Sequence, residues 1–215
     1  MTASGAETAA WEEAFATPEL VARRQRTYEA KLLRLGMQAP VDGRTLDVAC
    51  GRGDALQVLS RLGHRRLFGA DISWGANSTE YRRLIADGAQ LPLAGKSFER
   101  ILCVHSLHHF RSFDEIGRLL AECRRLLTDD GQLYLIDHWG SPWLRTIFRV
   151  LEWRCPVYPN IARQFGAQLR EEHDAIFWWL REWKKLYQEL QAAGFSIEHQ
   201  SRSATFLYLR CRLSE

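Results

Sequence analysis

The sequence has few cysteines and no cysteine pair. An odd number of scattered cysteines without a CxxC pair argues against a disulfide framework and against a zinc site. This usage indicates a reducing compartment, and we expect the protein in the cytoplasm. The five cysteines among the 215 residues are Cys50, Cys103, Cys123, Cys155 and Cys211.

Membrane spans, targeting signals and strong charge of one sign are also missing. Charged residues interrupt every long apolar stretch, so no segment is expected to span a bilayer. Residues 1–7 contain neither the basic start nor the apolar core of a signal peptide. The net charge is only +3, without a dense basic stripe, which argues against a nucleic-acid partner.

Segments typical of strands alternate with segments typical of helices. This alternation predicts an α/β fold in which helices cover both faces of a doubly wound, mostly parallel sheet. A final pair of strands, preceded by a long helix, would add an antiparallel hairpin at the sheet edge. The predicted strands are 44–49, 66–71, 83–86, 98–104, 131–137, 195–201 and 204–211, and the predicted helices lie within 7–36 and at 54–62, 75–83, 113–127 and 171–193.

A glycine-rich turn follows the first predicted strand, in the sequence DVACGRG at 47–53. Glycine has no Cβ and tolerates positive φ, so a small ligand can approach the backbone of such a turn closely. A dinucleotide fingerprint would need a third glycine at position 56, where this chain has Leu56. The turn therefore favours a ligand other than NAD or FAD, and a purely structural turn is the alternative.

Acidic and histidine residues follow the other strands of the predicted sheet. Because ligands bind beyond the carboxyl ends of parallel strands, we expect Asp71, Asp87, 105–109 and 137–138 on the same rim as the glycine turn. A carboxylate such as Asp71 can accept hydrogen bonds from both hydroxyls of a ribose. The alternatives are a helix N-cap for Asp71 and a surface turn for Asp87.

Three motifs resemble class I S-adenosylmethionine-dependent methyltransferases. The sequence 47–53 resembles motif I, with Ala49 in place of its first glycine. The sequence DGAQLPLAGKSFE at 87–99 is similar to the family's DAxxLPF…SFD region, with Gly88 where alanine is usual. The sequence VHSLHHF at 104–110 resembles the LHH signature of the small-molecule branch, which includes the ubiquinone and menaquinone methyltransferases.

The resemblance covers about residues 40–140 and implies a Rossmann-like, seven-stranded sheet with S-adenosylmethionine as the cofactor. It implies that Asp71 binds the ribose and Asp87 the adenine amino group, while the glycine turn holds the methionine half. The residues expected to bind the cofactor are Asp47, Ala49, Gly51, Gly53, Asp71, Ile72, Asp87, Gly88 and His105.

Histidines are the candidate catalytic residues. We expect His105, His109 and His138 around the methyl acceptor, because a neutral imidazole can remove a proton near neutral pH. A structural role is the alternative for the histidines at 108–109, and no acids at ligand spacing accompany them, so no metal site is expected. Further substrate contacts are expected from His108, Asp137, Trp139 and Trp143.

Tryptophans are concentrated in the last third of the chain. The stretch 139–187 combines them with arginines and could form a substrate lid, a membrane-facing surface or a buried helix face. The expected segments are an N-terminal helical cap at 1–40, a cofactor-binding core at 41–140, a Trp/Arg-rich helical lid and final helix at 141–193, and a C-terminal β-hairpin at 194–215.

These features predict a methyltransferase acting on a small, apolar or aromatic metabolite, by O- or C-methylation. The sequence at 105–108 lacks the Asn/Asp-Pro-Pro-aromatic motif typical of methyltransferases that act on amino groups of bases. Two alternatives remain: a protein methyltransferase, and a protein that binds S-adenosylmethionine without transferring its methyl group, either a cyclase or a non-catalytic partner. Peripheral membrane contact and the oligomeric state are left open.

Overall fold

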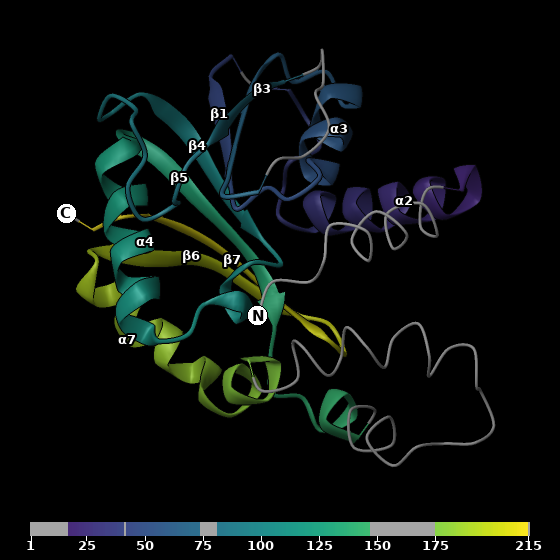
Figure 1. The fold of residues 1–215 in the computed structure, drawn as a ribbon, viewed down its shortest axis with the longest axis vertical. Helices are drawn as coiled ribbons and strands as arrows, with labels where there is room; N and C mark the ends of the chain where they lie inside the picture. Colours follow the sequence, from purple (N-terminus) through teal and green to yellow (C-terminus); the bar gives the residue numbers. More distant parts are fainter. Residues whose placement is uncertain (1–16, 41, 74–80, 147–174, 215) are drawn as a thin grey trace.

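A seven-stranded sheet in the order β3-β2-β1-β4-β5-β7-β6 organises the chain (Figure 1). The structure is a computed structural model that describes residues 17–40, 42–73, 81–146 and 175–214. Strands β1 to β5 run parallel, whereas β7 is antiparallel to both β5 and β6. The predicted α/β fold with a C-terminal antiparallel hairpin is confirmed. The strands are β1 (Arg44–Val48), β2 (Arg66–Asp71), β3 (Arg82–Ile85), β4 (Phe98–Val104), β5 (Leu127–His138), β6 (Phe195–Arg202) and β7 (Phe206–Leu213).

Helices cover both faces of the sheet (Figure 1). One face carries α2 (Pro18–Arg34) and α3 (Asp54–Arg61), whose Leu32 and Leu56 pack in one apolar cluster with the sheet. The other face carries α4 (Phe113–Leu126) and α7 (Leu186–Ala192) over a second cluster. Burial on both faces explains why the central strands are almost entirely apolar.

The start of α2 follows from its sequence. Thr17 caps the helix by accepting a hydrogen bond from Leu20 N at 3.4 Å, and Pro18 occupies the first turn, where its missing N–H costs nothing. Gly36, with φ +84°, follows the helix end. One buried residue of α2 is Lys31, an unusual residue type for a helix face that packs against a core.

The structure corrects the predicted helix at 171–193. Residues 175–182 are helical, but a 3-10 turn (η2, Trp183–Lys185) separates them from α7. The buried side chain of Trp183 lies at this interruption, and Leu186 resumes the buried face in α7. The amphipathic pattern therefore continues across the turn, although the α-helix does not.

Strand β3 (predicted at 83–86) begins at Arg82, within one residue of the prediction, and most of the helix predicted around 75–83 lies outside the described residues. One smaller prediction was wrong. The Asp129-Asp130-Gly131 sequence, predicted to precede a strand, lies inside β5, where pairing with β4 passes from Phe98–Leu127 directly to Arg100–Gln132. The chain bulges at these residues and returns to the same strand.

Several predicted features lie outside the described residues. They include the helix before Thr17, most of the proposed lid, and the side chains of Trp74, Trp153 and Cys155. In the part of the chain that the structure describes, no helix combines the length and apolar character needed to cross a membrane.

Candidate functional site

A cavity of about 870 Å³ lies at the carboxyl ends of β1, β2 and β4. This is where the strand order reverses between β1 and β4, the usual ligand position in doubly wound sheets. The predicted residues that line it are Ala49, Gly51, Asp71, Ile72, Asp87, Gly88, His105 and His109. The predicted residues that lie outside its lining are Asp47, Gly53, His108, Asp137, His138, Trp139 and Trp143.

Left-handed backbone conformations shape the turn after β1. Ala49, Gly51 and Gly53 have φ of 56°, 51° and 77°. A Cβ on Gly51 would meet no atom within 4 Å, so the turn leaves open space at that point, whereas one on Gly53 would collide with the Tyr81 hydroxyl. Glycine is required at position 53 by both conformation and space, and Ala49 adopts a conformation that favours glycine.

Asp71 and Arg83 fix this turn from the neighbouring strands. The Asp71 carboxylate accepts hydrogen bonds from Gly51 N at 2.7 Å and from Ser73 N at 2.8 Å. The Arg83 guanidinium donates to Gly51 O at 2.7 Å and to Ser73 O at 3.0 Å. An acid at the end of β2 and an arginine on β3 thus connect the turn to the rest of the cavity rim.

Two further acids differ in their surroundings. Asp87 lines the cavity, and its Oδ1 accepts from Ala89 N at 2.9 Å. Asp47 is 2% exposed beneath the turn, and its Oδ1 has no hydrogen-bond partner. Burial, together with the nearby Asp71 and Asp54 carboxylates, raises the pKa of Asp47 well above its usual value.

Asp137 is the acceptor of four hydrogen bonds at the end of β5. Its carboxylate accepts from the backbone N–H groups of Leu107 (2.8 Å), His108 (3.3 Å) and His138 (2.6 Å), and it contacts His108 Nδ1 at 2.7 Å. Burial opposes the charged form, but the His108 ring outweighs it and holds the pKa of Asp137 below its usual range. The carboxylate therefore pairs with the ring of His108 and, outside the cavity lining, does not make the substrate contact that the sequence predicted.

His105 faces the cavity and contacts a buried lysine. It ends β4 with φ 57°, and its Nε2 lies 2.6 Å from Lys31 Nζ on α2. Burial and the Lys31 charge hold the pKa of His105 well below its usual value. Lys31 is only 8% exposed, and burial lowers its pKa to about 8. His105 is therefore neutral at pH 7.

Aromatic rings surround this pair. Phe206, at the start of β7, packs with its ring centre 4.7 Å from those of His105 and His138. Lys31 Nζ lies 3.8 Å from the centre of the Phe206 ring, within cation–π range. Tyr28 lines the cavity, with its ring 5.9 Å from that of His105. Sequence reasoning missed these residues, and the only available signal was that Tyr28 and Lys31 are one turn apart on α2.

His138 lies behind His105. Their ring centres are 5.7 Å apart, and His138 Nδ1 is buried without a hydrogen-bond partner. Burial lowers the pKa of His138 from 6.5 to about 4.

Acid is expected to destabilise the protein through His138. Between pH 6.5 and about 4, the unfolded chain binds a proton on His138 that the folded chain does not, so stability falls as pH falls. The variant His138→Phe keeps a ring but cannot bind a proton, and we expect it to reduce this loss by about 2 kcal/mol. Urea unfolding at pH 7 and pH 4.5 measures the difference, and equal losses in the two proteins would contradict the assignment.

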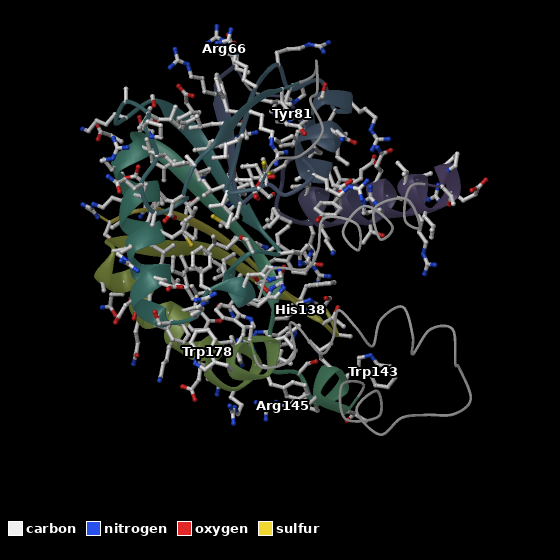
Figure 2. The ribbon with its side chains drawn as sticks, viewed as in Figure 1. Arg66, Tyr81, His138, Trp143, Arg145 and Trp178 are labelled. Atoms are coloured by element: carbon white, nitrogen blue, oxygen red, sulfur yellow. The ribbon has the colours of Figure 1, made fainter. Side chains whose placement is uncertain are left out.

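The described tryptophans do not line the cavity. Trp179 is fully buried and donates to His138 O at 2.7 Å, and Trp183 is also buried. Trp139 donates to Ser203 O at 3.0 Å. Trp143 is 60% exposed, and Figure 2 shows it apart from His138. Of the three interpretations of this stretch, the buried helix face describes Trp179 and Trp183.

Metal-ligating side chains do not gather at the cavity. Across the described ranges, no three His, Cys, Asp or Glu side chains are arranged to hold a metal ion. The ring of His108 stacks near that of His109, at 4.1 Å between centres, and also pairs with Asp137.

Sequence comparisons match the cavity-forming part of the chain. The family described as "Methyltransferase domain" matches residues 46–135. A demethylmenaquinone methyltransferase of Deinococcus radiodurans is 31% identical over 182 residues, which cover 76% of this chain and 71% of that protein. A demethylmenaquinone methyltransferase of Thermotoga maritima is 32% identical over 101 residues, which cover 44% of this chain and less than half (43%) of that protein.

A solved structure extends the fold comparison over the whole chain. The 1,6-didemethyltoxoflavin-N1-methyltransferase of Burkholderia thailandensis, bound to 1,6-didemethyltoxoflavin and S-adenosylhomocysteine, has a TM-score of 0.59 at 17% identity. The match covers 100% of this chain and 92% of that one, and it concerns the fold. The family match over β1 to β5, together with the Deinococcus relative, shows that this chain belongs to the class I methyltransferases, enzymes whose cofactor is S-adenosylmethionine.

Proposed function

We propose that this enzyme methylates a small aromatic metabolite at an oxygen or carbon atom. The observation that carries the proposal is a single cavity that joins the glycine turn and two acids to His105, His109 and Tyr28. One side suits a nucleoside-like cofactor, and the other offers rings and neutral nitrogen atoms to an acceptor. The similarity to proteins named as demethylmenaquinone methyltransferases supports a small-molecule acceptor.

The residues present fit S-adenosylmethionine. The open space at Gly51 admits a ligand close to the backbone, and the Asp71 and Asp87 carboxylates provide acceptors for hydroxyl and amino groups. When bound, the cofactor supplies a methyl group already activated by its sulfonium. The protein therefore has to position the acceptor and remove its proton.

We assign proton removal to His109 on the cavity wall, because an acceptor hydroxyl or acidic carbon loses a proton as it gains a methyl group. His105 lines the same cavity, but the lone pair of its neutral ring, on Nε2, faces the Lys31 ammonium at 2.6 Å. We therefore propose His105 as a wall of the acceptor site and not as the base. His108 and Asp137 are proposed as positioning residues, because their buried pair holds the turn that carries His109.

Two measurements test this function. S-adenosylhomocysteine should raise the melting temperature, whereas NAD should not. Label from tritiated S-adenosylmethionine should then appear in members of a panel of phenols and hydroquinones. Tight binding without label transfer to any acceptor would support a non-methylating protein, and label in protein substrates alone would support a protein methyltransferase.

Asp71→Asn is expected to weaken S-adenosylhomocysteine binding by at least about tenfold, because a hydrogen bond to a charged acceptor contributes about 1.5–3 kcal/mol. Calorimetric titration measures the affinity. Asp129→Asn is the matched control, because Asp129 is exposed on the β5 bulge and outside the cavity lining. Equal affinity in the two variants would remove Asp71 from the cofactor site.

The cytoplasm is the proposed compartment. The four described cysteines, Cys50, Cys103, Cys123 and Cys211, are buried free thiols, which is the usual state in a reducing environment.

A further inference from the structure

The two ring nitrogen atoms of His105 have different surroundings. Nε2 lies 2.6 Å from Lys31 Nζ, whereas Nδ1 has no hydrogen-bond partner among the described residues. Nδ1 is also not enclosed by the protein, in contrast to the buried, unpartnered Nδ1 of His138. Because His105 lines the cavity, a molecule bound there can reach this second nitrogen.

The contact with Lys31 determines which nitrogen of His105 carries the proton. At pH 7 Lys31 is below its pKa of about 8 and is an ammonium, while the ring of His105 is neutral. An ammonium has three N–H donors and no lone pair, so the atom that it faces at 2.6 Å has to supply one. The lone pair of the neutral ring is therefore on Nε2 and its proton is on Nδ1.

Packing holds the ring of His105 in this orientation. The Phe206 ring lies edge to face against it at 4.7 Å, and the Tyr28 ring does the same at 5.9 Å. Lys31 Nζ also lies 3.8 Å from the centre of the Phe206 ring, which fixes the ammonium from a second side. Turning the imidazole over would place a carbon atom against the ammonium in place of Nε2, so Nδ1–H stays on the open side.

We infer that His105 donates a hydrogen bond from Nδ1–H to the methyl acceptor, and that this acceptor carries a carbonyl or phenolate oxygen conjugated to the atom that is methylated. Lys31 is the positioning residue that fixes the donor. The inference rests on the proposed function, and it narrows the acceptor from aromatic compounds in general to those with such a second oxygen.

A donor at this position complements proton removal by His109, which lines the same cavity. When the acceptor loses its proton to His109, the electron pair left behind spreads onto the conjugated oxygen. A hydrogen bond to that oxygen strengthens as its negative charge grows, so it favours the deprotonated acceptor over the resting one. His105 does not compete for the proton, because its lone pair is engaged by Lys31.

The tautomer of His105 is measured by NMR. In the whole chain with isotope-labelled histidine, loaded with S-adenosylhomocysteine at pH 7, two-bond proton–nitrogen correlations show which ring nitrogen carries the proton, and His105→Asn identifies the signal. We expect the proton on Nδ1 in the wild-type protein and on both nitrogens in Lys31→Met, whereas the exposed control Lys184→Met keeps the wild-type signal. A proton on Nε2 in the wild-type protein, or a tautomer unchanged by Lys31→Met, would overturn the inference.

Two unreactive probes test the donor itself. The ketone tetralone and the hydrocarbon tetralin share a ring system and differ in one carbonyl oxygen. With S-adenosylhomocysteine bound, tetralone should shift the Nδ1 signal of His105 and tetralin should not. A tetralone that leaves this signal unmoved while it binds in the cavity contradicts the inference.

A matched pair of variants separates the donor from the shape of the side chain. Asn and Asp have the same shape and both tolerate the φ of 57° at position 105, but only the amide of Asn has an N–H to donate. In calorimetric titrations, the affinity ratio of tetralone to tetralin should be about fivefold higher for His105→Asn than for His105→Asp. Equal ratios in the two variants would overturn the inference.

Cofactor binding distinguishes this inference from the proposed function. Failure of the wild-type protein to bind S-adenosylhomocysteine would contradict the proposed function. Intact cofactor binding with the proton of His105 on Nε2 contradicts only the role given to His105 and the acceptor class.

Discussion

Replacing Asp137 by alanine is expected to lower the free energy of unfolding by about 3–5 kcal/mol, because several buried donors lose one charged acceptor at once. The substitution leaves the donors of Leu107, His108 and His138 without their acceptor in a buried setting. Urea unfolding at pH 7 measures the change.

Asp129→Ala provides the comparison. Asp129 also forms an ion pair, at 2.6 Å with Lys96, but both side chains are largely exposed. Exposed pairs contribute little, so we expect a change within about 1 kcal/mol. A similarly small change for Asp137→Ala would show that its hydrogen bonds do not hold the end of β5 to the 107–109 turn.

Lys31→Met is expected to stabilise the protein at pH 7 by about 2 kcal/mol while it removes the contact of Lys31 with His105. The folded protein lowers the pKa of Lys31 from 10.5 to about 8, so folding disfavours its ammonium form. From pH 8 to 10.5 the unfolded chain keeps a proton that the folded chain has lost, and wild-type stability rises with pH. Methionine carries no such proton. The stability that Lys31→Met gains over the wild-type protein should therefore be complete below pH 8 and absent at pH 10.5.

The same substitution should reduce methyl transfer by at least about 10²-fold, because the Lys31 ammonium fixes the orientation of the His105 ring on the cavity wall. Lys184→Met, on the exposed side of η2, is the control and should change neither property. Tritiated-methyl transfer and urea unfolding on the same preparations measure both effects. A stabilised variant with full turnover would remove Lys31 from the reaction and leave it a purely structural residue.

The sequence predicted several residues that line the cavity, because their positions depend on strand ends. Each parallel strand in the 44–104 region was placed within about two residues by its apolar run, and parallel strands present their carboxyl ends at one edge. Asp71, Asp87 and His105 line one cavity for this reason. Local sequence is sufficient when a residue's position is determined by the element that it terminates.

The acceptor side could not be predicted in the same way. The contact between Lys31 and His105 joins α2 to the end of β4, and Phe206 reaches them from β7. No local pattern specifies such contacts, because a lysine on an amphipathic helix is ordinarily exposed. The pairing of Asp137 with His108 depends likewise on the packing of β4 against β5.

The contact of Lys31 and Phe206 with His105 has an evolutionary consequence. Both residues lie outside the span 46–135 that matches the methyltransferase family, whereas the glycine turn, Asp71 and Asp87 lie within it. Under the proposed function, mutations in α2 or β7 would therefore alter which compound is methylated without disturbing the residues proposed to bind the methyl donor. A duplicated gene could acquire a new substrate through a few changes at the two ends of the chain, while inheriting its chemistry unchanged.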